Sequence, residues 1–226
     1  MKESVILHSP RLSSLRTLAV VLGLVFSLLP TLAQGQSADA RVDVSSLDRR
    51  LLTRMVWEET NRYREEHGRQ PVGWLEPLAL AAQNHAENMV ERNFFSHQNP
   101  YDPRLRTLRH RIARVGLSPR SYGENLALTF AVDYRARKEW TQNGRRGPAP
   151  GVGVHTYRSL ARSLVQQWAA SPGHKRNLLA RSFSLLGVGL ASESGDSKQT
   201  IYCVQTFASQ AGVLIGGNLP GTPGEG

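Results

Sequence analysis

Apolar residues recur at three- and four-residue spacing over much of the chain, and this spacing predicts amphipathic helices. The first helix is expected over residues 43–66, and a second over 77–93, with Pro77 in its first turn. A third is expected within the basic stretch 102–116, and a fourth over 157–170. The fourth helix has the clearest apolar stripe and is expected to stop at Ser171-Pro172-Gly173; the stripe comprises Leu160, Leu164, Val165 and Trp168.

The last quarter of the chain has the composition of β-strands instead. Residues 184–190 and 200–207 are strand-like runs separated by the polar turn Glu193-Ser194-Gly195-Asp196, which predicts an antiparallel pair. Residues 122–130 are expected to be an irregular turn that leads into a strand.

The first 33 residues have the layout of a secretory signal peptide. Basic residues precede an apolar run at 18–29, which is shorter than the roughly 20 residues that cross a bilayer. A membrane anchor is the alternative interpretation. Cleavage after Ala33 is favoured over cleavage after Ala40, although both follow a small-x-Ala pattern. The mature chain is therefore expected to be secreted, either extracellular or periplasmic, without a transmembrane helix.

Three further segments are expected to lie outside the packed body of the protein. Residues 34–46 are expected to be a linker, and residues 133–154 an inserted surface loop rich in Gly and Pro. The Gly- and Pro-rich tail at 211–226 is expected to be disordered. A folded domain over residues 47–210 remains.

Charge and cysteine content narrow the choice of partners and folds. The chain has 226 residues and a formal net charge of +10, which favours anionic partners without specifying a fold. The arginine-rich run at 104–114 is interpreted as a solvated helix face, because no nucleic-acid-binding module surrounds it, and no nucleic acid is expected. The single cysteine, Cys203, cannot form a disulfide within the chain and is expected to be a buried, unreactive thiol.

Two histidines and a glutamate are the candidate site residues. His97 and His174 follow small or turn residues, and Glu124 lies in the turn-like Gly123-Glu124-Asn125. Two imidazoles and a carboxylate suit a divalent metal such as zinc, or acid/base chemistry. The alternative is that both histidines are surface or capping residues. His85 lies on the apolar face of the second helix and is expected to be a core histidine.

Seven short segments follow one another over about residues 50–209, at 59–64, 80–86, 94–97, 122–127, 168–179, 186–189 and 204–207. Together and in this order, they resemble the CAP superfamily of SCP-like extracellular proteins, in its bacterial form. The resemblance implies an α+β fold, an α-β-α sandwich with a small central antiparallel sheet and a cleft.

The resemblance also implies a site, because animal and plant members have a cleft tetrad of two histidines and two glutamates that can hold a divalent metal. His97 and Glu124 match two positions of that tetrad, whereas the other two fall on Ser171 and Tyr202. His174 is expected to supply the missing imidazole. The expected metal-binding set is therefore His97, Glu124 and His174.

These residues support two functional hypotheses. The first is a secreted, non-enzymatic binding protein that holds a small lipid, sterol, glycan or peptide, or contacts another protein. The second is a hydrolase, either metal-assisted or dependent on His97 and Glu124 alone, in which His97 or Glu124 activates water against a peptide or cell-wall substrate. No Gly-x-Ser-x-Gly elbow or activated thiol supports nucleophilic catalysis, so binding is favoured. The protein is expected to be a monomer.

Overall fold

The computed structural model describes residues 36–132, 153–193 and 200–210. A short 3₁₀ helix, η1, comes first, at Val44–Ser46. The α-helices and strands then follow in the order α1 (Arg49–Glu66), β1 (Gly73–Trp74), α2 (Glu76–Glu91), α3 (Leu108–Arg114), β2 (Tyr122–Phe130), α4 (Tyr157–Ala170), α5 (Pro172–Leu178), β3 (Leu185–Ser192) and β4 (Thr200–Ala208).

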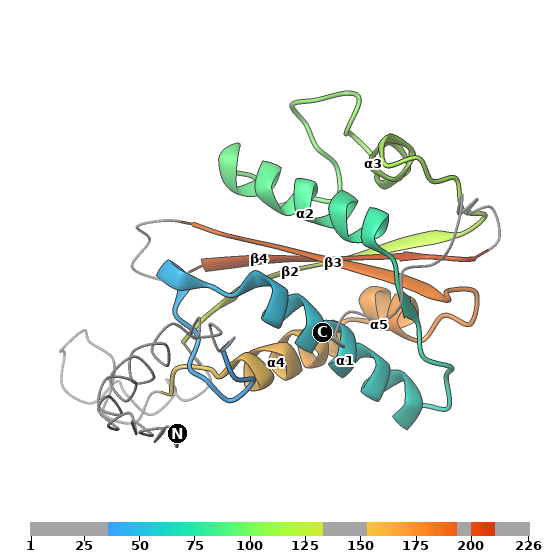
Figure 1. The fold of residues 1–226 in the computed structure, drawn as a ribbon. Helices are drawn as coiled ribbons and strands as arrows, with labels where there is room; N and C mark the ends of the chain where they lie inside the picture. The colour runs from blue at the N-terminus through green and yellow to red at the C-terminus, as the bar shows by residue number, and fades with distance from the viewer. Residues whose placement is uncertain (1–35, 133–152, 194–199, 211–226) are drawn as a thin grey trace, which may run out of the picture. The chain divides into compact units, whose positions relative to one another are not determined.

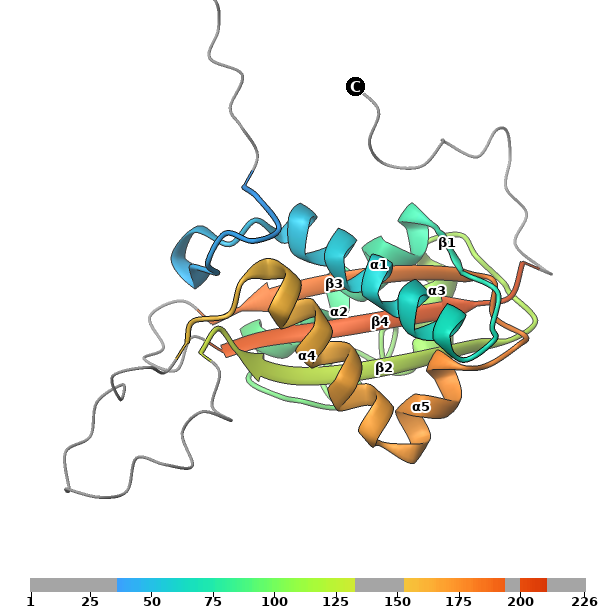
Figure 2. The ribbon, with the colours of Figure 1, turned by 90° about the horizontal axis from the view of Figure 1, so that it is seen from below.

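These elements form three layers, with the sheet between two layers of helices (Figure 1). Helices α2 and α3 cover one face, whereas α1, α4 and α5 cover the other (Figures 1 and 2). The strand order is β1-β3-β4-β2, so the long strand β2 lies at one edge of the sheet. The structure confirms the expected α-β-α sandwich.

The sheet is antiparallel along its three long strands. Strand β4 pairs with β3 on one side and with β2 on the other, and Phe207 lies opposite both Leu186 and Gly123. The two-residue β1 is the exception, since it runs parallel to β3. All nine residues of β4 are buried because helices cover both faces, which explains why its sequence is apolar over most of its length.

Strand β3 packs unusually close to helix α2, and glycine makes this approach possible. A Cβ atom on Gly187 would lie 2.0 Å from the backbone nitrogen of Ala79, and one on Gly189 would lie 2.1 Å from that of Gln83. Both glycines face α2 because they are two residues apart on the strand. This contact fixes the position of α2 above the sheet.

On the face of the sheet opposite α2, the largest fully buried side chain belongs to Trp168 of α4. Its indole Nε1 donates a hydrogen bond to the carbonyl oxygen of Leu126 on β2, at 2.9 Å. Helix α4 covers the predicted residues 157–170 and begins with a capping box at Thr156. The predicted burial of Cys203 is confirmed as well, and burial raises the pKa of its thiol.

Several element boundaries differ from those expected from the sequence. Helix α1 begins at Arg49 because Asp48 caps it. Helix α3 covers only Leu108–Arg114, since the preceding residues form turns and Thr107 caps the helix. Pro172 does not merely end α4: it opens the short helix α5, which the sequence pattern did not predict. Residues 122–130 are a strand throughout, without the expected turn.

The segments expected outside the domain are only partly described. Residues 36–46, the described part of the expected linker, contact the start of α4: Val42 is buried, and its backbone N–H donates to the carbonyl oxygen of His155. Val132 and Val154 pair across the base of the expected loop. Residues 1–35, 133–152, the turn at 194–199 and the tail lie outside the described residues. Among the helices that the structure describes, none is long and apolar enough to cross a membrane.

Candidate functional site

The three candidate residues come together at the edge strand β2. Glu124 lies on β2, His97 in the connection between α2 and α3, and His174 on α5. The helices that flank His97 and the helix that carries His174 cover opposite faces of the sheet (Figure 1). Because β2 is an edge strand, residues from both layers meet beside it: the His97 and His174 ring centroids are 6.2 Å apart.

Glu124 is a buried carboxylate with a partner on each oxygen. Its Oε1 accepts a hydrogen bond from His97 Nδ1 at 2.9 Å, and its Oε2 accepts one from Arg111 Nη2 at 2.6 Å. Burial by itself would raise the pKa of this carboxyl. The hydrogen bond from His97 and the charge of Arg111 outweigh burial and hold the pKa below its ordinary value, so Glu124 is an anion at neutral pH.

Arg111 is the site residue that sequence reasoning missed. The sequence predicts a solvated face for the arginine-rich run, but the side chain of Arg111 is only 3% exposed. Besides Glu124, it donates to the carbonyl oxygens of Leu105 and His97, so it fixes the connection that carries His97. The signal was its spacing: residues 108, 111, 112 and 115 form one helical stripe, and Arg111 shares the stripe with three apolar residues.

His97 is oriented by Glu124 and exposes its other nitrogen. An ionised carboxylate can only accept hydrogen bonds, so Nδ1 of His97 carries the proton in this pair. In the neutral ring, Nε2 is then an acceptor, and it makes no hydrogen bond within the described part of the chain. The side chain is 55% exposed, so a ligand can reach it from solvent.

His174 is held in place through the backbone of its helix. Its carbonyl oxygen accepts a hydrogen bond from Asn125 on β2 at 3.3 Å. On the same helix, Asn177 donates to the Glu124 carbonyl oxygen and to the Asn125 side chain. Partial burial and the neighbouring His97 lower the pKa of His174, which favours its neutral form. The site therefore presents two imidazoles side by side.

The two remaining family positions do not extend this set of ligands. Ser171 is the capping residue between α4 and α5. The hydroxyl group of Tyr202 donates a hydrogen bond to Glu193 at 2.7 Å. Among the described residues, no three His, Cys, Asp or Glu side chains form a group that could hold a metal ion. Both carboxylate oxygens of Glu124 already accept hydrogen bonds, one of them from the guanidinium of Arg111. As arranged, these residues do not fit the three protein ligands that catalytic zinc takes.

The sequence predicts a metal site at His97, Glu124 and His174 whereas the geometry does not favour one, and a zinc titration decides between the two expectations. The geometry leads us to expect no tight one-to-one uptake of Zn²⁺ at neutral pH by isothermal calorimetry. Tight uptake that His97→Ala and His174→Ala each abolish, and that His110→Ala on the exposed face of α3 leaves intact, would overturn this expectation.

His85, predicted to be a core histidine, lies next to this cluster and is 1% exposed. Burial of the ring and the nearby positive charge of Arg111 lower the pKa of His85 to about 4. The neighbouring His97 lowers this pKa further, whereas the negative charge of Glu124 raises it. In an unfolded chain the pKa of histidine is about 6.5. Between these two values the unfolded chain binds a proton that the folded chain does not, so stability falls as the pH falls.

Titration of His85 alone should therefore lower the free energy of unfolding by about 3 kcal/mol between pH 6.5 and pH 4. This value follows from about 1.4 kcal/mol for each unit of pKa difference. Urea unfolding at several pH values measures it. His85→Gln, which does not titrate, should have a shallower pH dependence in this range. Identical slopes for the two proteins would show that His85 is not the titrating group.

The layers, the sheet order and the site at the edge strand together define an α-β-α sandwich of the kind that the sequence segments suggested. A model of the Cysteine-rich secretory protein family, the CAP family, matches residues 57–207. The chain belongs to this family.

Solved structures of bacterial proteins have a similar fold. A crystal structure of an extracellular protein containing an SCP domain, from Bacillus anthracis, has a TM-score of 0.50 and 25% sequence identity over 72% of this chain and 41% of its own. An outer surface protein from Borrelia burgdorferi shares the fold, with a TM-score of 0.51 and 15% identity over 76% of this chain and 99% of its own.

Curated relatives are similar over part of their length. The uncharacterized protein YkwD of Bacillus subtilis is 26% identical over 142 residues, which are 62% of this chain and 42% of YkwD. The uncharacterized membrane protein YlbC of the same organism is 28% identical over 137 residues, or 61% of this chain and 31% of YlbC. The chain thus spans less than half the length of these relatives.

Proposed function

We propose that this protein is an exported, non-enzymatic binding protein whose His97–Glu124–His174 cluster contacts the polar part of a small ligand. Export is supported by the layout of residues 1–33 and by the similarity to an extracellular SCP-domain protein and an outer surface protein. The ligand classes we propose are a lipid, a sterol, a glycan or a peptide, and a hydroxyl or N–H group of such a ligand can donate a hydrogen bond to a neutral imidazole.

The observation that carries this proposal is the state of Glu124. Hydrolysis by general acid/base catalysis needs a group that takes up and releases a proton near the working pH. Glu124 is instead held as an anion by Arg111 and His97, with both oxygens occupied. It acts as a fixed support that orients His97, and the outward Nε2 of His97 is left to bind a ligand.

Extraction of the protein from its native host tests the proposal. Protein purified from the culture medium or envelope fraction is denatured, and released small molecules are identified by untargeted mass spectrometry. We expect the wild type to release a compound in near-stoichiometric amount, His97→Ala to release at least tenfold less, and His110→Ala to match the wild type. No enrichment in the wild type over His97→Ala would contradict binding at this cluster.

A hydrolase is the second candidate, and the Glu124–His97 hydrogen bond is the observation that favours it. A carboxylate that orients an imidazole is also the arrangement of a general base. In that case His97 Nε2 would take a proton from water during attack on a peptide or cell-wall bond. Turnover of peptidoglycan fragments or peptides by the purified wild type, lost in His97→Ala and retained in His110→Ala, would favour this alternative.

A further inference from the structure

A broad groove lies beside α3, between this helix and the start of β2. It has a volume of about 650 Å³ and is lined by residues of α3 and of the segment 116–122, and we call it the α3–β2 groove. Gly116 follows α3 with a left-handed φ of 78°, which glycine adopts readily, and turns the chain toward β2. The inference drawn from this groove does not depend on the function proposed for the His97–Glu124–His174 cluster.

The α3–β2 groove carries positive charge. Arg109 of α3 and Arg120, just before β2, both line it, and none of its lining residues within the described part of the chain is Asp or Glu. Both arginines are exposed, so a ligand can reach them from solvent. A guanidinium is a planar fork of N–H donors that matches the two oxygens of a carboxylate. The groove therefore suits an anion.

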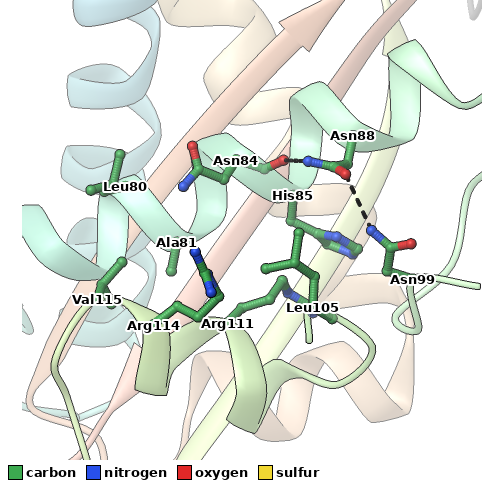
Figure 3. A pocket seen from close by; sticks show the side chains of 10 residues that line it. All are labelled: Leu80, Ala81, Asn84, His85, Asn88, Asn99, Leu105, Arg111, Arg114 and Val115. Carbon is green, nitrogen blue, oxygen red and sulfur yellow. Dashed lines mark hydrogen bonds between the residues drawn. The ribbon is translucent and has the colours of Figure 1, made fainter. Parts of the chain in front are cut away.

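The surface around the groove has the same sign of charge. Six arginines and no Asp or Glu occur over residues 103–120. Of these six, only Arg104 and Arg111 form ion pairs with residues that the structure describes. Arg111 and Arg114 lie on the side of α3 that faces α2 and line a separate pocket of about 150 Å³ there (Figure 3). An approaching anion thus meets positive charge on both sides of α3, which favours its capture.

The base of the α3–β2 groove is apolar. Leu117 and Pro119 line it and are buried, and the ring of Tyr122 is 40% exposed at its β2 end. An exposed aromatic ring offers a flat apolar surface on which a ligand can pack, and its hydroxyl group adds a polar contact. The anion that suits this groove therefore belongs to a molecule with an apolar face.

The surroundings of the groove indicate what else the ligand must have. Ser118 and the two arginines are exposed, so the outer side of a bound molecule stays in water and must be polar. An acidic peptide fits poorly, because the backbone N–H groups of Gly116 and Leu117 already donate to carbonyl oxygens of α3. Its Asp and Glu side chains also lack a flat apolar face for Tyr122.

A sugar acid meets all of these requirements. A pyranose ring has an apolar face of C–H groups and a rim of hydroxyl groups, and a uronic acid adds one carboxylate to each ring. We propose that the α3–β2 groove binds uronic acid units of an acidic glycan, with a sugar ring packed on Tyr122 and carboxylates paired with Arg109 and Arg120.

Three tetramers separate the contributions of ring and charge. The purified protein is titrated with tetragalacturonate, with cellotetraose, which has rings without carboxylates, and with N-acetylated, C-amidated tetraglutamate, which has carboxylates without rings. Binding is followed by ¹H–¹⁵N spectra. We expect saturable shifts at the amides of α3 and residues 116–122 with tetragalacturonate, and binding of the other two that is weaker by about tenfold or more. Equal binding of either control, or no binding of tetragalacturonate, would overturn the proposal.

Matched variants test whether the groove itself is responsible. Arg109→Gln with Arg120→Gln should weaken tetragalacturonate binding about tenfold, and Tyr122→Ala should weaken it by a similar factor. Arg50→Gln with Arg92→Gln removes the same charge from the start of α1 and the end of α2, and it should change binding by less than about twofold. All four arginines are exposed, so both double variants should retain the wild-type unfolding temperature. Equal losses in the two double variants would show that net charge alone attracts the sugar, and the proposal would be wrong.

Discussion

Arg111→Met should lower the free energy of unfolding by about 3–5 kcal/mol, because it leaves the Glu124 carboxylate buried without its charge partner. The guanidinium lies 2.6 Å from Glu124 Oε2, and each side chain is 3% exposed. Methionine has a similar length and keeps much of the apolar contact of the arginine stem, so the loss should report mainly the charge. Chemical denaturation at pH 7 measures it.

Two further variants separate this effect from a general loss of helix α3. Arg109→Met removes an exposed arginine from the same helix and should change stability by less than about 1 kcal/mol. The double variant Arg111→Met with Glu124→Gln removes the buried charge together with its partner, and it should recover a large part of the loss. Equal losses for Arg109→Met and Arg111→Met would contradict a buried ion pair.

Trp168→Ala should destabilise the protein by about 3–5 kcal/mol, through lost apolar burial and the cavity that remains. Trp168 has no exposed surface, and from α4 its side chain packs into the core between α1 and the sheet. The substitution also removes the indole donor of the Leu126 carbonyl oxygen, which lies two residues along β2 from Glu124. The variant should therefore perturb the site as well as the core.

Thermal and urea unfolding of Trp168→Ala measure this loss, and Leu80→Ala is the matched control. Leu80 is also a large apolar residue on a helix, but half of its surface is exposed. We expect the control to lose far less stability than the tryptophan variant. A thermal unfolding curve of Trp168→Ala that coincides with the wild type would contradict the core position of this residue.

The long helices α1, α2 and α4 and the central strands were predictable because local pattern decides them, whereas the short helix α5 was not predicted. The stripe of α4 and the apolar runs of β3 and β4 correspond to buried faces in the structure. The strand β2 was less predictable because Gly123 resembles a turn residue. In the structure, Gly123 is needed for space instead: a Cβ atom there would lie 2.9 Å from both Asn177 and Phe183. This requirement comes from tertiary packing and has no local signature.

The candidate site was predictable in part. His97, Glu124 and His174 were identified from their positions and from the family segments, and the structure brings them together. Arg111 was missed because its partner, Glu124, is on another element. A charge pair between two elements has no fixed separation in the sequence, so no local pattern indicates it. The helical stripe that it shares with Ile112 was the available signal, since an arginine on an apolar stripe needs a buried partner.

A long-range ¹H–¹⁵N spectrum of the histidine side chains at neutral pH tests the Arg111–Glu124–His97 arrangement most directly. In the wild type we expect neutral His97 to carry its proton on Nδ1, with Nε2 as the acceptor. Glu124→Leu, which removes the acceptor of the Nδ1 proton, should shift the ring toward the Nε2–H form that is common in free histidine. A wild-type His97 already protonated on Nε2, or one whose tautomer Glu124→Leu leaves unchanged, would contradict the arrangement on which the proposed binding site depends.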